Sequence, residues 1–135
     1  MAVDPWGEVL HEAGTEEAAF TVTLDAERLE PADYPRSILD FIDAAFRPET
    51  AAIAYPVFGT TATHAGALYA VLGDERAGEY FSDLAASGVR VVDGNSVVRD
   101  LVASGQLAFG LTDSDDACAA VANGAKVEIV LPDQE

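Results

Sequence analysis

Residues 51–64 read Ala51-Ala-Ile-Ala-Tyr-Pro-Val-Phe-Gly-Thr-Thr-Ala-Thr-His64 and continue into an apolar helical pattern as far as Leu72. The first five residues predict a buried strand, Pro56 to Gly59 predict a turn, and the threonine-rich segment predicts the start of a helix. The first N–H groups of a helix lack intrahelical partners and carry partial positive charge. We therefore expect an anion-binding corner here, although a threonine that only caps the helix would give the same pattern.

Composition and charge restrict what a chain of 135 residues can do. Its hydrophobic content of 50% is enough for one domain with a real core. Seven basic residues oppose 24 acidic ones, and the formal net charge is −17. The electrostatic field of this negative charge repels nucleic acid and anionic membranes, so we expect neither as a partner. An anion would have to bind through local contacts.

Cysteine content and hydropathy limit the chain further. Cys118 is the only cysteine, so the sequence contains no intrachain disulfide and no metal site built on cysteine pairs. No segment is long and apolar enough to span a bilayer, and the N-terminal residues lack the basic-then-apolar pattern of an export signal. On these residues we expect no membrane insertion, and a cytoplasmic protein if the chain is complete as given.

The remaining sequence alternates expected strands and helices. Apolar runs predict strands at Ala51–Tyr55, Val89–Val92, Leu107–Leu111 and Lys126–Leu131, and polar alternation predicts a half-buried or edge strand at Phe20–Leu24. Helical spacing predicts helices at Ile38–Phe46, around 60–72, 74–87 and 96–103, and from Thr112 to Ala122. This order predicts an α/β fold, a three-layer sandwich with a mostly parallel sheet. We divide it into an N-terminal arm with a crossover or edge strand, 1–28, and an α/β lobe, 29–135.

Three of the expected strand-to-helix junctions carry polar residues: Gly59 to Thr63, Asn95 with Ser96, and Thr112 to Asp116. In open α/β sheets the carboxyl ends of parallel strands meet at one edge, where helix N-termini converge and ligands bind. Each junction taken alone is compatible with a structural cap. Three at one edge favour a shared ligand site.

The same junctions carry a resemblance to a known family. Three ordered motifs resemble the substrate-binding proteins of iron(III)-type ABC transporters: Phe-Gly-Thr-Thr-Ala-Thr-His at 58–64, Gly-Val-Arg-Val-Val-Asp-Gly-Asn-Ser-Val-Val-Arg-Asp at 88–100, and Gly-Leu-Thr-Asp-Ser-Asp-Asp-Ala at 110–117. The resemblance covers roughly residues 29–135 and only the second lobe of a type II periplasmic-binding-protein-like fold. It implies a two-lobed clamshell with the ligand between the lobes, an extracytoplasmic location and an ABC permease as partner.

The resemblance also implies ligand-contact residues. The residues that correspond to anion contacts in the family are Gly59, Thr60, Thr61, Asn95 and Ser96. Two adjacent tyrosines bind ferric iron in the family, and here Asp115 and Asp116 stand in their place. Adjacent carboxylates suit a divalent cation or the ammonium group of a zwitterion such as an aminophosphonate. As acids at a helix N-terminus, they would otherwise only stabilise the helix dipole.

The function implied by the resemblance is that of a single solute-binding lobe of an ABC importer, for iron(III) or for an anionic or phosphonate-type solute, and not an enzyme. The alternatives are a stand-alone interaction module that self-associates through an unpaired lobe face, or a truncated fragment that binds nothing. Any metal ion, iron or divalent, would be bound as ligand at Asp115 and Asp116.

An aspartate-based phosphotransfer enzyme is a weaker alternative. It would use Asp113, Asp115 and Asp116 with Lys126, but Lys126 opens the last expected strand and lies at the other end of the sheet. The sequence also lacks a phosphate-binding Gly-rich loop with Lys-Ser or Lys-Thr and the common hydrolase motifs. His64 lies a turn inside its helix, so we expect it to pack or to form a hydrogen bond rather than bind a metal.

The acidic composition predicts that stability depends on salt. Screening over a Debye length of ~10 Å at 0.1 M salt reduces the repulsion among exposed carboxylates. We expect the melting temperature, followed by circular dichroism, to rise markedly from low salt to molar KCl. A melting temperature that stays constant over this range would indicate an ordinary acidic protein rather than a salt-adapted surface.

Overall fold

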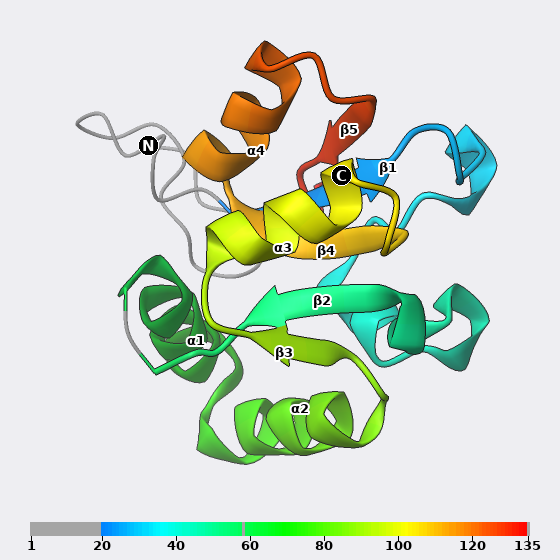
Figure 1. Ribbon diagram of the computed structural model, residues 1–135. Coiled ribbons are helices and arrows are strands. Elements are labelled where there is room, and N and C mark those ends of the chain that lie inside the picture. The colour runs from blue at the N-terminus through cyan, green and yellow to red at the C-terminus, as the bar shows by residue number, and fades with distance from the viewer. Residues whose placement is uncertain (1–19, 58, 135) are drawn as a thin grey trace.

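The computed structural model describes residues 20–57 and 59–134. The arm expected at residues 1–19 lies outside them. In the described part of the chain, five strands form one sheet: β1 (Phe20–Asp25), β2 (Ala51–Ala54), β3 (Arg90–Val92), β4 (Phe109–Asp113) and β5 (Val127–Val130). Their spatial order is β3-β2-β4-β1-β5, which Figure 1 shows from bottom to top.

Strand directions confirm the predicted α/β class. Strand β2 pairs in parallel with β3 and with β4, whereas β1 pairs antiparallel with both β4 and β5. Strand β5 therefore runs in the same direction as β4, so β1 alone among the five described strands runs the other way. The sheet is mostly parallel, as the alternation of strands and helices predicts.

Helices cover both faces of this sheet and give the three expected layers. They are α1 (Gly59–Leu72), α2 (Asp74–Ala86), α3 (Asn95–Ala103) and α4 (Ser114–Ala122). Successive residues of a strand point to opposite faces. Ala51 and Ile53 of β2 accordingly lie in the core cluster that includes residues of α1 and α2, while Ala52 and Ala54 pack with residues of α3 and α4. No helix of the described residues is long and apolar enough to cross a membrane.

Strand β1 corrects the prediction of an edge strand at Phe20–Leu24, because it lies between β4 and β5. Thr21 and Thr23, which suggested a water-facing side, are buried. Their hydroxyl groups lie 3.3 Å and 2.6 Å from the hydroxyl of Thr112 on β4. Because a buried polar group that has a hydrogen-bond partner avoids most of the desolvation cost, this threonine face needs no water.

The helix predicted at Ile38–Phe46 is wrong, and two short 3-10 turns take its place, Ile38–Phe41 and Ala44–Phe46. Ser37 and Asp40 form a capping box around the first turn, which ends at Phe41 with Ile42 as its C-cap. The Asp43 carboxylate then accepts a hydrogen bond from the backbone N–H of Ala45 at 2.8 Å and starts the second turn. Such local side-chain bonds compete with a continuous helix.

Helices α1 and α2, expected around 60–72 and 74–87, form a helical hairpin. Gly73 joins α1 to α2 with a φ of 82°, a conformation that L side chains rarely adopt. The rings of Tyr69 and Phe81 stack across the hairpin with centroids 5.8 Å apart.

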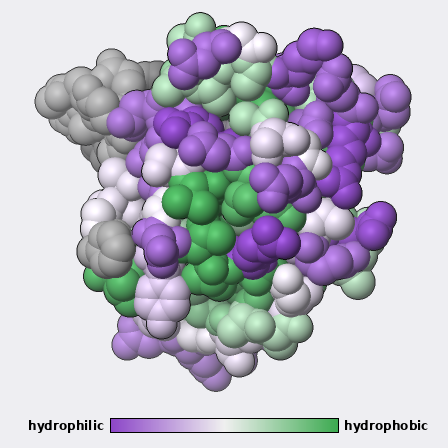
Figure 2. Space-filling view, viewed as in Figure 1, coloured by the Kyte–Doolittle hydropathy of each residue, from purple (hydrophilic) through white to green (hydrophobic). Residues whose placement is uncertain are grey.

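Figure 2 shows an apolar area on the face of the molecule that carries α3, bordered by hydrophilic residues. Val91 of β3 and Val97 of α3 are 44% and 40% exposed.

Gly110 allows helix α3 to approach strand β4 closely. A Cβ atom added at Gly110 would clash with Cγ1 of Val98 and lie 3.2 Å from the carbonyl oxygen of Ala52. Val98 is fully buried on α3 and, being β-branched, has little rotameric freedom in a helix. The contact can be relieved only by moving the helix or the strand.

Gly110→Ala should therefore lower the free energy of unfolding by about 1–3 kcal/mol, the usual cost of overpacking a core. Urea unfolding followed by circular dichroism measures it. Gly66→Ala is the matched control, since Gly66 lies within α1 with nothing within 4 Å of an added Cβ. The control should be neutral or stabilising by about 0.5–1 kcal/mol. Equal destabilisation by the two substitutions would contradict the close approach of α3.

Candidate functional site

The three polar junctions meet at one edge of the sheet. Strands β3, β2 and β4 are parallel neighbours, and their carboxyl ends lead into α3, α1 and α4 respectively. A pocket of about 220 Å³ lies at these helix N-termini. Six of the seven expected ligand-contact residues line it: Gly59, Thr60, Thr61, Asn95, Ser96 and Asp116. The sequence motifs, far apart along the chain, thus form one surface.

Asp113 connects the three junctions; it belongs to the third expected junction, Thr112 to Asp116, but was not among the expected ligand contacts. Its side chain is buried, with the residue only 7% exposed. Oδ2 accepts hydrogen bonds from the Thr60 hydroxyl and from the Asn95 amide nitrogen, each at 3.0 Å. Oδ1 accepts one from the backbone N–H of Asp116 at 3.2 Å and so caps helix α4.

This arrangement changes the expected role of two anion-contact residues. The Asn95 amide nitrogen also donates to the Thr60 hydroxyl oxygen at 2.9 Å, so both side chains are directed into the contacts around Asp113. They already hold an anion, which is the protein's own carboxylate. A second anion in this pocket would face a like charge and would have to use backbone N–H groups at the helix ends.

The other expected anion contacts differ in accessibility. The Thr61 hydroxyl is largely buried and lies 3.4 Å from the Asn95 side-chain oxygen, to which it donates. This contact fixes the orientation of the Asn95 amide, because its nitrogen must then face Asp113. Ser96 is exposed at the start of α3. Gly59 has a φ of 65° and open space where a side chain would project, so ligand atoms can approach its backbone.

Asp115 and Asp116 have different environments. Asp116 lines the pocket, and its Oδ1 lies 2.8 Å from Nη1 of Arg99. Burial and the neighbouring Asp113 raise the pKa of Asp116 to about 6, although Arg99 acts in the opposite direction. Asp115 is exposed and is not among the residues that line the pocket. Adjacent residues on a helix point in different directions, which is why the two acids separate.

The metal site expected at Asp115 and Asp116 stays a prediction, and of the two residues only Asp116 lines the pocket. Within the described residues, 20–57 and 59–134, no group of three or more histidine, cysteine, aspartate or glutamate side chains is placed to hold a metal ion. Asp116 is instead paired with Arg99. The pocket does contain a third carboxylate, Asp93, which the sequence analysis did not single out.

Two further expectations concern residues outside this pocket. Lys126 pairs with Glu27, Nζ to Oε1 at 2.7 Å, and precedes β5, so it does not join the acidic residues at the carboxyl edge. His64 is buried in α1, in agreement with an interior role. Burial lowers the pKa of His64 to about 4, so its imidazole is neutral at pH 7.

Asp116→Asn should change how stability depends on pH. The pKa of Asp116 rises from 3.8 to about 6 on folding, so the folded protein holds this proton more tightly than the unfolded chain. The resulting stabilisation is present below about pH 4 and is lost as pH rises through about 6. The difference in unfolding free energy, wild type minus variant, should therefore fall between pH 4 and pH 7.

Urea unfolding across this pH range measures that difference. Asp100→Asn is the control, because Asp100 also contacts Arg99, at 2.8 Å, but is an exposed residue outside the pocket. This control shows what the loss of a carboxylate beside Arg99 does outside the pocket. If the difference for Asp116→Asn does not fall more than that for Asp100→Asn between pH 4 and pH 7, the partly buried, acid-rich environment assigned to Asp116 is wrong.

No protein-family model matches this sequence, and no curated protein does. Solved structures do resemble it. Iron-bound HitA from Pseudomonas aeruginosa has a TM-score of 0.72 and 15% identity, with 82% of this chain and 36% of HitA covered. The periplasmic binding protein P5PA has a TM-score of 0.71 and 24% identity, and the match covers 86% of this chain and 37% of P5PA. The periplasmic binding protein AfuA from Actinobacillus pleuropneumoniae, with fructose-6-phosphate bound, has a TM-score of 0.69 and 25% identity. This match covers 84% of this chain and 36% of AfuA.

The chain therefore spans little more than a third of the length of the proteins it resembles. Within that part, the similarity extends over most of the described elements. It confirms the resemblance inferred from the three sequence motifs: the chain has the fold of one lobe of the periplasmic binding proteins of ABC transporters.

Proposed function

We propose that this chain is a solute-binding lobe of an ABC importer and that its solute is a zwitterion whose cationic group lies against the acidic side of the pocket. One observation carries the choice of ligand: Asp113 occupies the position in which a solute anion was expected, with Thr60 and Asn95 as its donors. The pocket is already negative, so the solute must bring positive charge to it.

The charges that line the pocket support a cationic group. Asp93, Asp113 and Asp116 are among its lining residues, and no lysine or arginine is. Arg99 contacts Asp116 from outside the lining and offsets one negative charge. Asp113 already accepts three hydrogen bonds, whereas the carboxylates of Asp93 and Asp116 also line the pocket and can accept a hydrogen bond from the solute. An ammonium group makes a charge-assisted hydrogen bond with such an acceptor.

The helix N-termini supply the complementary half of the site. Gly59 at the start of α1 and Ser96 in the first turn of α3 line the same pocket. Backbone N–H groups at such positions bind carboxylate or phosphonate oxygens. A solute with an ammonium group and an anionic group at a short distance would therefore use both the acidic residues and the helix ends.

A complete importer would add a second lobe and a permease. Tyr55, which lines the pocket, and the neighbouring Val57 are 55% and 60% exposed. A second lobe closing over the solute would bury these side chains, as the two-lobed family implies. Self-association is the alternative, since a second copy would bury the same surface. As a lobe of an ABC importer, the protein would lie outside the cytoplasm, with a binding rather than a catalytic role.

Binding of 2-aminoethylphosphonate, followed by two-dimensional ¹H–¹⁵N NMR, tests the proposal. We expect amide shifts to cluster at Gly59–Thr61, Asn95–Ser96 and Asp113–Asp116. The affinity should be millimolar, or about −4 kcal/mol, because one lobe leaves much of the solute in water. Ethylphosphonate, which lacks the ammonium group, should bind at least tenfold more weakly.

Variants separate the acidic residues of the pocket from the general charge of the surface. Asp116→Asn should weaken binding of 2-aminoethylphosphonate about tenfold, equivalent to about 1.4 kcal/mol. Asp100→Asn removes an exposed carboxylate that contacts the same arginine, and it should leave binding unchanged. If ethylphosphonate bound as well as the zwitterion, or if the shifts lay elsewhere, the proposed site would be wrong.

A further inference from the structure

A larger pocket, of about 400 Å³, lies at the opposite edge of the sheet from the candidate site. It forms where Arg28 and Leu29 follow β1, Thr50 precedes β2 and Ala108 precedes β4. The amino ends of β2 and β4 define this edge, whereas their carboxyl ends define the site described above. The volume falls within the range of small-molecule sites, roughly 300–1,000 Å³.

The interior of this pocket is apolar. Ala108 and Phe109 are 4% and 1% exposed, and Leu29 and Phe46 pack against the same core. The ring of Phe109 contacts that of Phe41 edge to face, with centroids 5.0 Å apart, so its position is fixed by the core. These side chains offer a preformed surface for a hydrocarbon or aromatic group.

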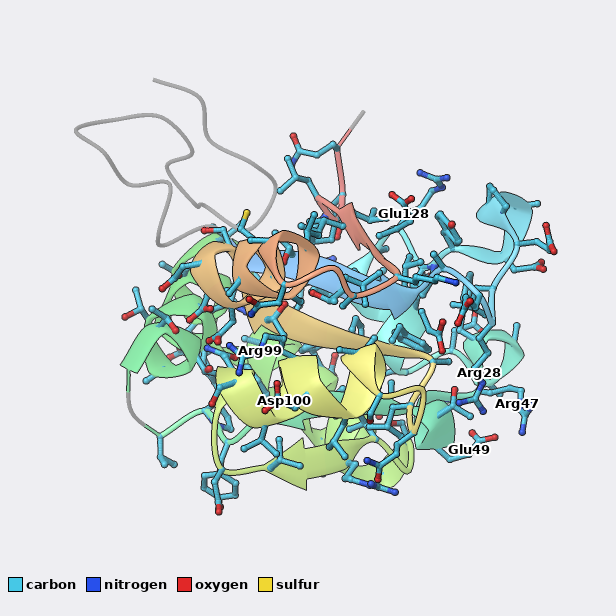
Figure 3. All side chains as sticks on the ribbon, turned by 45° about the horizontal axis from the view of Figure 1, so that its top comes forward. Arg28, Arg47, Glu49, Arg99, Asp100 and Glu128 are labelled. Carbon is cyan, nitrogen blue, oxygen red and sulfur yellow. The ribbon has the colours of Figure 1, made fainter. Side chains whose placement is uncertain are left out.

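Two arginines line the same pocket, in a chain with only seven basic residues against 24 acidic ones. Figure 3 shows Arg28 and Arg47 at one end of the molecule, away from Arg99. Arg28 Nη1 donates to the Gly105 carbonyl at 3.4 Å, and Arg47 Nε pairs with Glu49 at 3.2 Å. The Arg47–Glu49 pair is well exposed, and exposed ion pairs contribute little.

Most of the guanidinium donors remain for another partner, since each group has five. The lining contains two guanidinium groups and one carboxylate, Asp33, and the Glu49 carboxylate that pairs with Arg47 lies outside the lining. The backbone of Arg47 is held in the left-handed region, with φ 55° and ψ 67°. Its carbonyl accepts hydrogen bonds from the N–H and the hydroxyl of Thr50, both at 2.8 Å, which fix this turn at the pocket.

We infer that this pocket binds a small amphipathic anion, in which an aromatic or branched aliphatic group contacts Leu29, Phe46 and Phe109 and a carboxylate pairs with Arg28 and Arg47. The planar guanidinium group binds a carboxylate through two parallel hydrogen bonds, which favours this head group over a neutral amide. The site is separate from the zwitterion pocket and does not depend on it.

Titration with phenylacetate, followed by two-dimensional ¹H–¹⁵N NMR, tests this inference on the full chain. Amide shifts should cluster at Leu29, Asp33, Arg47, Thr50 and Ala108. Phenylacetamide keeps the ring without the charge, and acetate keeps the charge without the ring. Each should bind at least fivefold more weakly than phenylacetate. Equal binding of phenylacetate and phenylacetamide, or the absence of shifts at this pocket, would overturn the inference.

Substitutions identify the arginines as the anion contacts. Arg28→Gln and Arg47→Asn, measured singly and together, should weaken phenylacetate binding, by at least tenfold in the double variant. Asparagine is chosen at position 47 because it tolerates the left-handed backbone. Arg76→Gln is the control, since Arg76 is not among the residues that line this pocket. Unchanged affinity for phenylacetate in the double variant, or an equal loss of affinity in the control, would contradict the assignment. The amide shifts that 2-aminoethylphosphonate causes at Gly59–Thr61 should persist in all variants, because that pocket is separate.

Discussion

The buried carboxylate of Asp113 is the contact on which the carboxyl edge of this lobe depends. It ends β4, caps α4 through the N–H of Asp116, and accepts hydrogen bonds from Thr60 of α1 and Asn95 of α3. A buried charge is tolerated only when hydrogen bonds and favourable dipoles surround it, and three helix N-termini supply both. One side chain thus fixes three helices relative to one another. The same side chain makes the pocket between them negative.

The sequence predicts the layers of the fold better than the position of one strand. Short apolar runs identify β2 and β4, because burial on both faces requires such runs. The Thr21–Thr23 alternation instead suggests a wet face, since the sequence does not reveal that their hydroxyls meet Thr112. At 38–46 the helical spacing is present, but Asp43 and its bond to Ala45 divide the segment. Both errors arise where polar side chains form hydrogen bonds that the pattern of apolar residues does not reveal.

The same limit applies to the candidate site. Topology alone brings Thr60, Asn95 and Asp116 to one edge, because their strands are parallel neighbours, and the sequence predicts this. It does not predict that Asp113 takes up the donors, since that depends on distances between helices. Its place two residues after the expected strand and directly before Ser-Asp-Asp, typical of a helix N-cap, was the available signal. The pocket at the other edge combines Arg28 with Arg47 through irregular segments, which have no periodicity to reveal the pairing.

The central place of β1 has a consequence for how the protein acquires its structure during synthesis. Thr21 of β1 meets Thr112 of β4, 91 residues later in the chain, and Val22 pairs with Val130 of β5. When the chain has emerged from the ribosome as far as β3, the pair β2–β3 and the α1–α2 hairpin can form, but both edges of β1 still lack their partners. Pairings this distant in sequence form slowly, and unpaired strand edges promote aggregation. The nascent chain therefore completes its sheet only after β4 and β5 have left the ribosome, and until then β1 is a natural target for chaperones.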